Sequence, residues 1–131
     1  MNKNSYNKVI IVGHLGGDPE GRYTKSGIPT SSFSVATNES WKQPGGSFSE
    51  HTEWHSIVAW DKLADFSNDY LFKGQLVTVE GHLRTRSWKD SQGRVQKKTE
   101  IISSNIVPLE WKTKKLFFLY IFFFFFPFFF S

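Results

Sequence analysis

The sequence contains no cysteine, which excludes disulfide bonds and thiolate metal sites. No hydrophobic segment follows the opening MNKNSYNK, and an arginine-rich amphipathic presequence is also missing, so we expect a cytoplasmic protein. The glycine-rich GHLGG at 13–17 is not followed by Gly-Lys-Ser/Thr, so it is a poor match to a phosphate-binding loop and predicts a strand kink instead. Neither a Ser-His-Asp order nor a clustered carboxylate pair stands out. We therefore expect no catalytic residues and no cofactor.

A zinc pair at His51 and His55 is disfavoured by the expected backbone. The two residues are spaced i, i+4 in HTEWH, which would share one face of a helix. The run is instead the start of a strand, where four residues span roughly 13 Å between Cα atoms, too far to share one ion. We therefore expect no metal site.

The positive charge is local rather than global. The net charge is +4, but residues 1–110 hold 13 Lys/Arg and 12 Asp/Glu, and Lys112, Lys114 and Lys115 supply the rest. Between residues 84 and 98 there are six basic side chains and one acidic one. Such a block is a plausible footprint for phosphates, and it is equally compatible with the solvated face of a hairpin.

The pattern along the chain predicts an all-β domain with one helix. Strands are expected at 7–16, 30–38, 52–60, 75–88 and 95–110, whereas 17–29 is rich in turn formers and 39–51 resembles a long flexible loop. Five strands with one helix between the third and fourth are the element order of the OB-fold, a Greek-key barrel that often binds oligonucleotides. The expected domain covers residues 1–110, and the basic, then Phe-rich, tail at 111–131 is expected to be irregular and outside the fold.

The helix is expected at 61–74, because Leu63, Phe66, Tyr70 and Leu71 form a helical stripe. Asp61 can serve as its N-cap and Gly74 as its C-terminal stop.

In the strand that follows the helix, alternation separates two faces. Val77, Val79 and Leu83 lie on one face. The other face carries Glu80, His82, Arg84, Arg86 and Trp88.

Four tryptophans lie beside polar or basic residues, namely Trp41, Trp54, Trp60 and Trp88. Tryptophan usually helps to close a core or a subunit contact. Here a separate aliphatic set is available for the core, and aromatic rings interleaved with Lys/Arg suit the stacking of unpaired bases. A duplex exposes only base edges and would not use the ring faces.

Several segments together resemble the bacterial-type single-stranded DNA-binding protein family. They are NKVIIVGHLGGDPEGRYTKSG, SFSVATNESW, TEWHSIVAWDKLADFSNDYLFKG and VTVEGHLRTRSW, and the resemblance covers about residues 6–109. It implies a homotetramer of OB-folds that binds single-stranded DNA without sequence preference during replication, recombination and repair.

The resemblance also implies roles for individual residues. Trp41, Trp54, Trp60 and Trp88 would stack on bases, and His55 would lie near the subunit interface. The phosphate contacts would come from Lys8, Arg22, Lys62, Lys73, Arg84 and Arg86. Two departures concern this site: Trp60 stands where phenylalanine is common, and Ser56 and Ser87 stand where basic residues are frequent.

The tail is the largest departure from the family. Family members usually end in an acidic tip that recruits replication and repair enzymes, whereas Glu110 is the last acidic residue here and ten phenylalanines follow it. A frame change in the gene, a genuine variant tail and an interfacial membrane anchor are the open interpretations; 116–130 is too short for a span of about 20 residues. In each case we expect weakened recruitment of partners that bind the acidic tip. A membrane-associated protein and an OB-fold RNA-binding or scaffold module remain the alternative functions.

Overall fold

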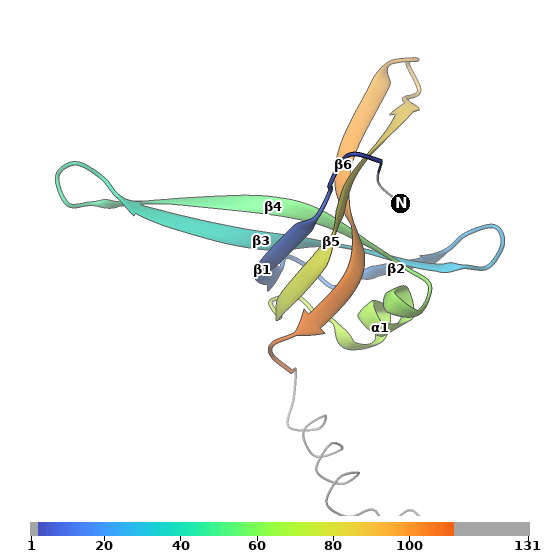
Figure 1. Cartoon of the computed structure of the whole chain (residues 1–131), viewed down its shortest axis with the longest axis horizontal. Helices are drawn as coiled ribbons and strands as arrows, with labels where there is room; N and C mark the ends of the chain where they lie inside the picture. The colour runs from blue at the N-terminus through green and yellow to red at the C-terminus, as the bar shows by residue number, and fades with distance from the viewer. Residues whose placement is uncertain (1–2, 112–131) are drawn as a thin grey trace, which may run out of the picture.

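The computed structural model describes residues 3–111, so the prediction for the tail beyond Trp111 lies outside the described residues. These residues form six strands and one helix, whose arrangement can be followed in Figure 1. The strands are β1 Val9–Leu15, β2 Glu20–Tyr23, β3 Pro29–Lys42, β4 Phe48–Trp60, β5 Leu76–Lys89 and β6 Val95–Pro108, and the helix α1 is Lys62–Tyr70.

Five of the strands close a barrel. The pairing order is β1-β5-β6-β4-β3, and β1 pairs again with β3 at His14↔Ala36 and Leu15↔Val35. The closure depends on Gly13, since a Cβ atom there would lie 2.1 Å from the carbonyl oxygen of Ala36. With α1 between β4 and β5, this is the predicted OB-fold, and the prediction is confirmed. The short β2 pairs with β3 outside the barrel and was not predicted, because turn formers dominate its neighbourhood.

The core consists of the aliphatic residues that the strands turn inward. Val35, Ala59, Val77 and Val79 have no exposed surface, and Ile57 is almost as buried. In β3 and β4 these are the odd-numbered positions, so the even-numbered side chains of both strands point outward. This alternation decides which tryptophans can face solvent on the barrel.

Three hairpins leave the barrel with the same tight turn. In each, the residue that follows the first strand donates its N–H to the carbonyl four residues later, and a glycine donates its N–H back to the carbonyl of that first residue. The glycines are Gly27, Gly46 and Gly93, all with φ between 78° and 93°, a region that favours glycine.

The predicted flexible loop at 39–51 is wrong. The register of β3 and β4 runs unbroken from Thr30↔Trp60 to Lys42↔Phe48, so most of this segment is paired strand. Residues 43–47, with Pro44-Gly45-Gly46 at their centre, join the two strands. Figure 1 shows the resulting β3–β4 hairpin as a long arm, and a second arm is formed by β5 and β6.

The helix begins after Asp61, which occupies the predicted N-cap position, but it ends earlier than predicted. The side chain of Asp61 makes no capping hydrogen bond, and its φ is 58°. The helix ends at Tyr70, where Leu71 adopts an extended conformation, so Gly74 is not the helix stop. Gly74 instead donates its N–H to the carbonyl of Leu15, in the connection to β5.

Leu83 lies on the predicted aliphatic face of β5, but its side chain is 49% exposed and does not join the core. It shares a strand face with the buried Val77 and Val79, but β5 continues beyond the barrel into an arm, where residues 82–89 are all exposed. Among residues 3–111, no helix has the length and apolar character that crossing a membrane requires.

Candidate nucleic-acid interface

The outward face of β4 carries two of the predicted tryptophans. Trp54 and Trp60 are even-numbered, as is Ser56 between them, whereas the neighbouring Ile57 and Ala59 point into the core. The rings remain accessible, with Trp54 59% and Trp60 45% exposed. They therefore offer ring surface to solvent on one side of the barrel.

Trp54 rests on a glycine. A Cβ atom at Gly16 would lie 2.5 Å from Cζ3 of Trp54 and 2.7 Å from Oγ of Ser34, so any other residue there would displace the ring. Trp54 also pairs in register with Ala36, which is only 7% exposed. Small residues beneath the indole thus let it lie against the barrel while more than half of it stays open.

A polar groove of about 410 Å³ lies on the same side of the molecule. Its floor includes the outward-facing Ser32, Ser34 and Ser56 of β3 and β4. Its walls come from β2, with Glu20 and Arg22, and from the base of the β5–β6 arm, with Arg86, Lys98 and Glu100. The groove forms where β6 diverges from β4, because these two strands pair only at Ile57↔Ile101 and Val58↔Ile102.

Two of the groove's cations are held by carboxylates. Arg22 donates to Oε1 of Glu20 at 2.6 Å, and this hydrogen bond raises the pKa of the Arg22 guanidinium. Arg86 donates from Nε to Oε1 of Glu100 at 2.8 Å. Both partners of the Arg22–Glu20 pair are mostly exposed, so Arg22 can exchange its carboxylate for a phosphate at little desolvation cost, whereas Glu100 is buried beneath Arg86.

The predicted cationic face of β5 is present on the β5–β6 arm. Arg84, Arg86 and Trp88 share one face, and the Arg86 guanidinium carbon lies 4.6 Å from the centre of the Trp88 ring. At this distance a cation–π contact forms between the two side chains. Trp88 is 41% exposed, so the rest of the ring is open to solvent.

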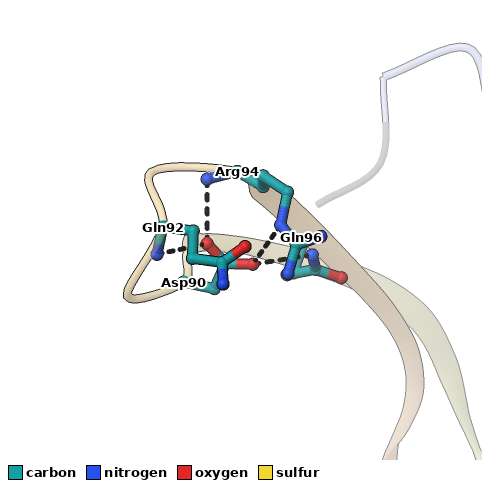
Figure 2. Close-up of polar contacts among 4 residues, drawn as sticks. All are labelled: Asp90, Gln92, Arg94 and Gln96. Atoms are coloured by element: carbon teal, nitrogen blue, oxygen red, sulfur yellow. Dashed lines mark hydrogen bonds and ion pairs between the residues drawn. The ribbon is translucent and has the colours of Figure 1, made fainter.

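The tip of this arm is organised by Asp90 (Figure 2). Its carboxylate accepts hydrogen bonds from the backbone N–H groups of Gln92 and Arg94 and from the side chains of Arg94 and Gln96. The hydrogen bond from the Arg94 backbone is the main reason that the pKa of Asp90 is lowered. The tip is therefore held by a side chain as well as by its turn.

Trp41 lies on the opposite face of the β3–β4 ribbon from Trp54. The unbroken register makes the faces alternate strictly, and Trp41 is odd-numbered. Its face is shared by His51 and Glu53, whose side chains are hydrogen-bonded at 2.7 Å, and this hydrogen bond lowers the pKa of Glu53. Trp41 is 46% exposed but belongs to the arm rather than to the groove.

The other predicted residues do not line the groove. Lys8 forms an ion pair with Glu80 at 2.6 Å, and hydrogen bonding to Glu80 raises the pKa of Lys8. Lys62 is exposed at the start of α1. Lys73 is exposed beyond the helix, and its backbone N–H donates to Asp18. His55 is half-buried, with a ring nitrogen 2.9 Å from Oγ1 of Thr37.

Sequence reasoning missed Lys98 and the two carboxylates of the groove. Lys98 belongs to the basic block at 84–98, and pairing the even positions of β5 and β6 would have placed it opposite Arg86. Glu20 lies in the unpredicted strand β2, so its place in the groove had no signal. Within residues 3–111, no cluster of His, Asp or Glu could hold a metal ion.

Comparison with known proteins identifies a matching family and a similar protein. Residues 6–109 match the model of the Single-strand binding protein family. The chain is 50% identical over 101 residues to Single-stranded DNA-binding protein 1 of Chlorobaculum tepidum, which covers 76% of this chain and 62% of the relative. The chain thus spans less than two thirds of that relative's length.

Two solved structures are similar to the fold. The Plasmodium falciparum SSB complex with ssDNA has a TM-score of 0.73 at 36% identity, covering 84% of this chain and 100% of that one. A deletion mutant of the single-stranded DNA binding protein from Thermus aquaticus has a TM-score of 0.70 at 28% identity, covering 80% of this chain and 51% of that one. With the family match extending over most of the barrel and both arms, the chain belongs to the single-strand binding protein family.

Proposed function

We propose that this protein binds single-stranded DNA with little regard to sequence and thereby protects it during replication, recombination and repair. One observation carries the proposal. Two exposed indoles and a groove that contains three cationic side chains lie on the same side of the barrel. The proposed action is binding rather than catalysis, in the cytoplasm at the nucleoid. The solved relative from Plasmodium falciparum is a complex with ssDNA, which supports this choice of ligand.

The chemistry of the face favours an unpaired strand. Every base presents a π-face, so Trp54 and Trp60 accept any sequence, and a charged groove follows the sugar-phosphate backbone. In a duplex the base faces are stacked on one another and only their edges are accessible in the grooves. Double-stranded DNA would therefore leave both rings unused.

The proposed base-stacking residues are Trp41, Trp54, Trp60 and Trp88. All four rings are between 41% and 59% exposed, so none needs to leave the core in order to stack. The proposed phosphate contacts are Lys8, Arg22, Lys62, Lys73, Arg84 and Arg86, to which the groove adds Lys98. Arg22, Arg86 and Lys98 have the strongest structural support, because they converge on one groove.

Titration of the full chain with oligo(dT), oligo(U) and a DNA duplex tests the proposal. We expect oligo(dT) to quench the tryptophan fluorescence, and the affinity to fall as salt rises because phosphate-bound cations are released. The duplex should bind far more weakly. Equal binding of oligo(U) would favour the RNA-binding alternative, and fluorescence unchanged by excess oligo(dT) would overturn the proposal.

We also propose that the chain assembles into a homotetramer. Among the described residues β1 pairs with β3 only at His14 and Leu15, so its edge at Val9–Val12 is free to pair with another strand. The outward Ile10 and Val12 are 62% and 51% exposed, an apolar surface that association would cover. His55 is proposed to lie near the subunit interface.

Light scattering on the full chain tests this assembly, with four chains as the expected mass. Charged residues at Ile10 and Val12 should reduce that mass if the β1 surface carries the contact. A monomeric mass for the unaltered chain would contradict the proposal.

A further inference from the structure

Glu100 is a buried carboxylate at the base of an otherwise exposed, cationic arm. It is 9% exposed, whereas residues 95–99, which precede it on β6, are all exposed. In register it stands directly opposite Arg84, and it shares its face of β6 with Lys98. A carboxylate among cations at a phosphate-binding site would by charge alone oppose phosphate binding, so its position needs another explanation.

The contacts of Glu100 lead to a stacking residue. Oε1 of Glu100 accepts a hydrogen bond from Nε of Arg86 at 2.8 Å, and the guanidinium of Arg86 lies 4.6 Å from the centre of the Trp88 ring. The arginine is thus fixed at one side by the carboxylate and at the other by the indole. Within residues 3–111, Arg86 donates a side-chain hydrogen bond from Nε alone, so its two terminal NH₂ groups are available as donors.

We propose that Glu100 is a positioning residue for single-strand binding. It holds Arg86 against one face of Trp88, so that a base stacks on the other face while the terminal NH₂ groups of Arg86 contact the adjoining phosphate. The proposal rests on the proposed function of this surface. Its physical basis is preorganisation, because an arginine already held in the bound geometry loses less conformational freedom when DNA binds.

Glu100→Gln in the full chain separates positioning from simple charge. The substitution keeps the side-chain shape and removes one negative charge beside the phosphate path, so a purely electrostatic role predicts tighter binding. Positioning predicts the opposite: oligo(dT) affinity falls about tenfold, and the slope of log K against log[salt] flattens by about 0.7, the value for one lost phosphate contact on a single strand.

Glu20→Gln is the matched control. Glu20 lines the same groove and pairs with Arg22, but its side chain is 65% exposed and Arg22 contacts no ring among the described aromatic pairs. Loss of this carboxylate removes a negative charge beside the phosphate path and releases Arg22, so the affinity is expected to increase. If both Glu→Gln variants raise the affinity, charge alone explains the two carboxylates and the proposal is overturned.

A double-mutant cycle tests whether Glu100 acts through Arg86. In an Arg86→Met background, Glu100→Gln should have no further effect on affinity or on the salt slope. The same loss in both backgrounds would mean a general structural role and would overturn the proposal. Circular dichroism and thermal unfolding check that each variant is folded.

If Glu100→Gln does not fold, Arg86→Lys tests the positioning role of Glu100 instead. Lysine keeps the charge but cannot bind a carboxylate, cover the ring and contact a phosphate with one planar group. Positioning predicts a loss like that of Glu100→Gln, and wild-type affinity would overturn it. If the unaltered chain does not bind oligo(dT), the proposed function fails together with this inference. If the unaltered chain binds oligo(dT) and both Glu→Gln variants bind it more tightly, only this inference fails.

Discussion

The two arms of the molecule share a backbone design and differ in chemistry. The β3–β4 arm and the β5–β6 arm are both long antiparallel ribbons, and both end in the same glycine-containing turn, at Gly46 and Gly93. Residues 38–53 of the first arm carry three acidic side chains and one basic one, whereas residues 84–98 of the second carry six basic and one acidic. Figure 1 shows them leaving the barrel in different directions.

This difference shows that the hairpin backbone extends the binding surface away from the barrel, whereas its side chains determine which parts of a ligand it can bind. On the β5–β6 arm the cations and Trp88 share a face that continues into the groove, so stacking and phosphate contact can occur together. On the β3–β4 arm Trp41 shares its face with the His51–Glu53 pair, on the other side of the ribbon from Trp54. We therefore expect the acidic arm to contribute stacking with little charge attraction.

The largest expected effect comes from removing the ring on each arm. Trp88→Ala should weaken oligo(dT) binding by tenfold to about 100-fold, in line with roughly 1–3 kcal/mol per stacked base, a general value for OB-folds that bind single strands. Trp41→Ala should lie at the low end of that range, because no cation packs beside its ring in the described structure. Anisotropy of a labelled oligonucleotide measures both.

Phenylalanine variants at the same two positions serve as controls, since they keep an aromatic face and should keep most of the affinity. A loss at Trp41 equal to or larger than that at Trp88 would show that the neighbouring cation adds nothing to stacking.

The second prediction compares two neighbouring lysines on the basic arm. Lys98 lines the groove, whereas Lys97 pairs with Ser87 and points to the other face of the ribbon. Lys98→Ala should lower the affinity severalfold and flatten the salt slope by about 0.7, and Lys97→Ala should change both much less. Titrations at several salt concentrations give the slopes, and equal slopes for the two variants would mean that the whole arm acts as a diffuse charge.

The fold was largely predictable because its signals are local and periodic. Alternation placed Val77 and Val79 in the core, and one helical stripe between strands was enough to identify the OB-fold order. The exposure of Leu83 was not predictable, because alternation specifies a face of the strand but not what covers that face. Leu83 has the pattern of a core residue on a strand that has already left the barrel.

The candidate site was less predictable, because it depends on which strands diverge. Pairing β3 with β4 would have revealed that Trp41 and Trp54 lie on opposite faces, but proline and two glycines made 39–51 resemble a loop rather than a hairpin with a short turn. The groove requires β6 to part from β4 after two register pairs, which no local pattern encodes. The basic block was recognisable from composition, while the roles of Glu20 and Glu100 within it were not.

The third prediction concerns a substitution that reduces the charge difference between the two arms. Glu39 faces His51 in register on the β3–β4 arm, and Glu39→Gln removes one of that arm's three negative charges. We expect affinity for oligo(dT) to rise roughly threefold at low salt and the gain to disappear at high salt, because exposed charges are screened over about 10 Å at 0.1 M. A gain that persists at high salt would indicate a direct contact instead of a field effect.

The smallest effect concerns the two arm tips and their response to acid. The Asp90 carboxylate is held by four hydrogen bonds (Figure 2), mainly that from the Arg94 backbone N–H, and its pKa is lowered. Because the folded pKa lies below the unfolded value, the stabilisation is present above the ordinary aspartate pKa and is lost as the pH falls through the folded value.

Backbone amide shifts of Gln92 and Arg94, followed by NMR from neutral to acid pH, should therefore titrate with a midpoint below about 3.9, the ordinary value for aspartate. Asp90→Asn should abolish this step, and its cost in unfolding free energy relative to the unaltered chain should vanish in acid. The Gly46 amide is the internal control, since the β3–β4 turn begins at Gln43, which does not ionise. A midpoint at or above the ordinary value would show that the hydrogen bonds in Figure 2 do not favour the ionised carboxylate, and the two tips would then differ in sequence but not in electrostatics.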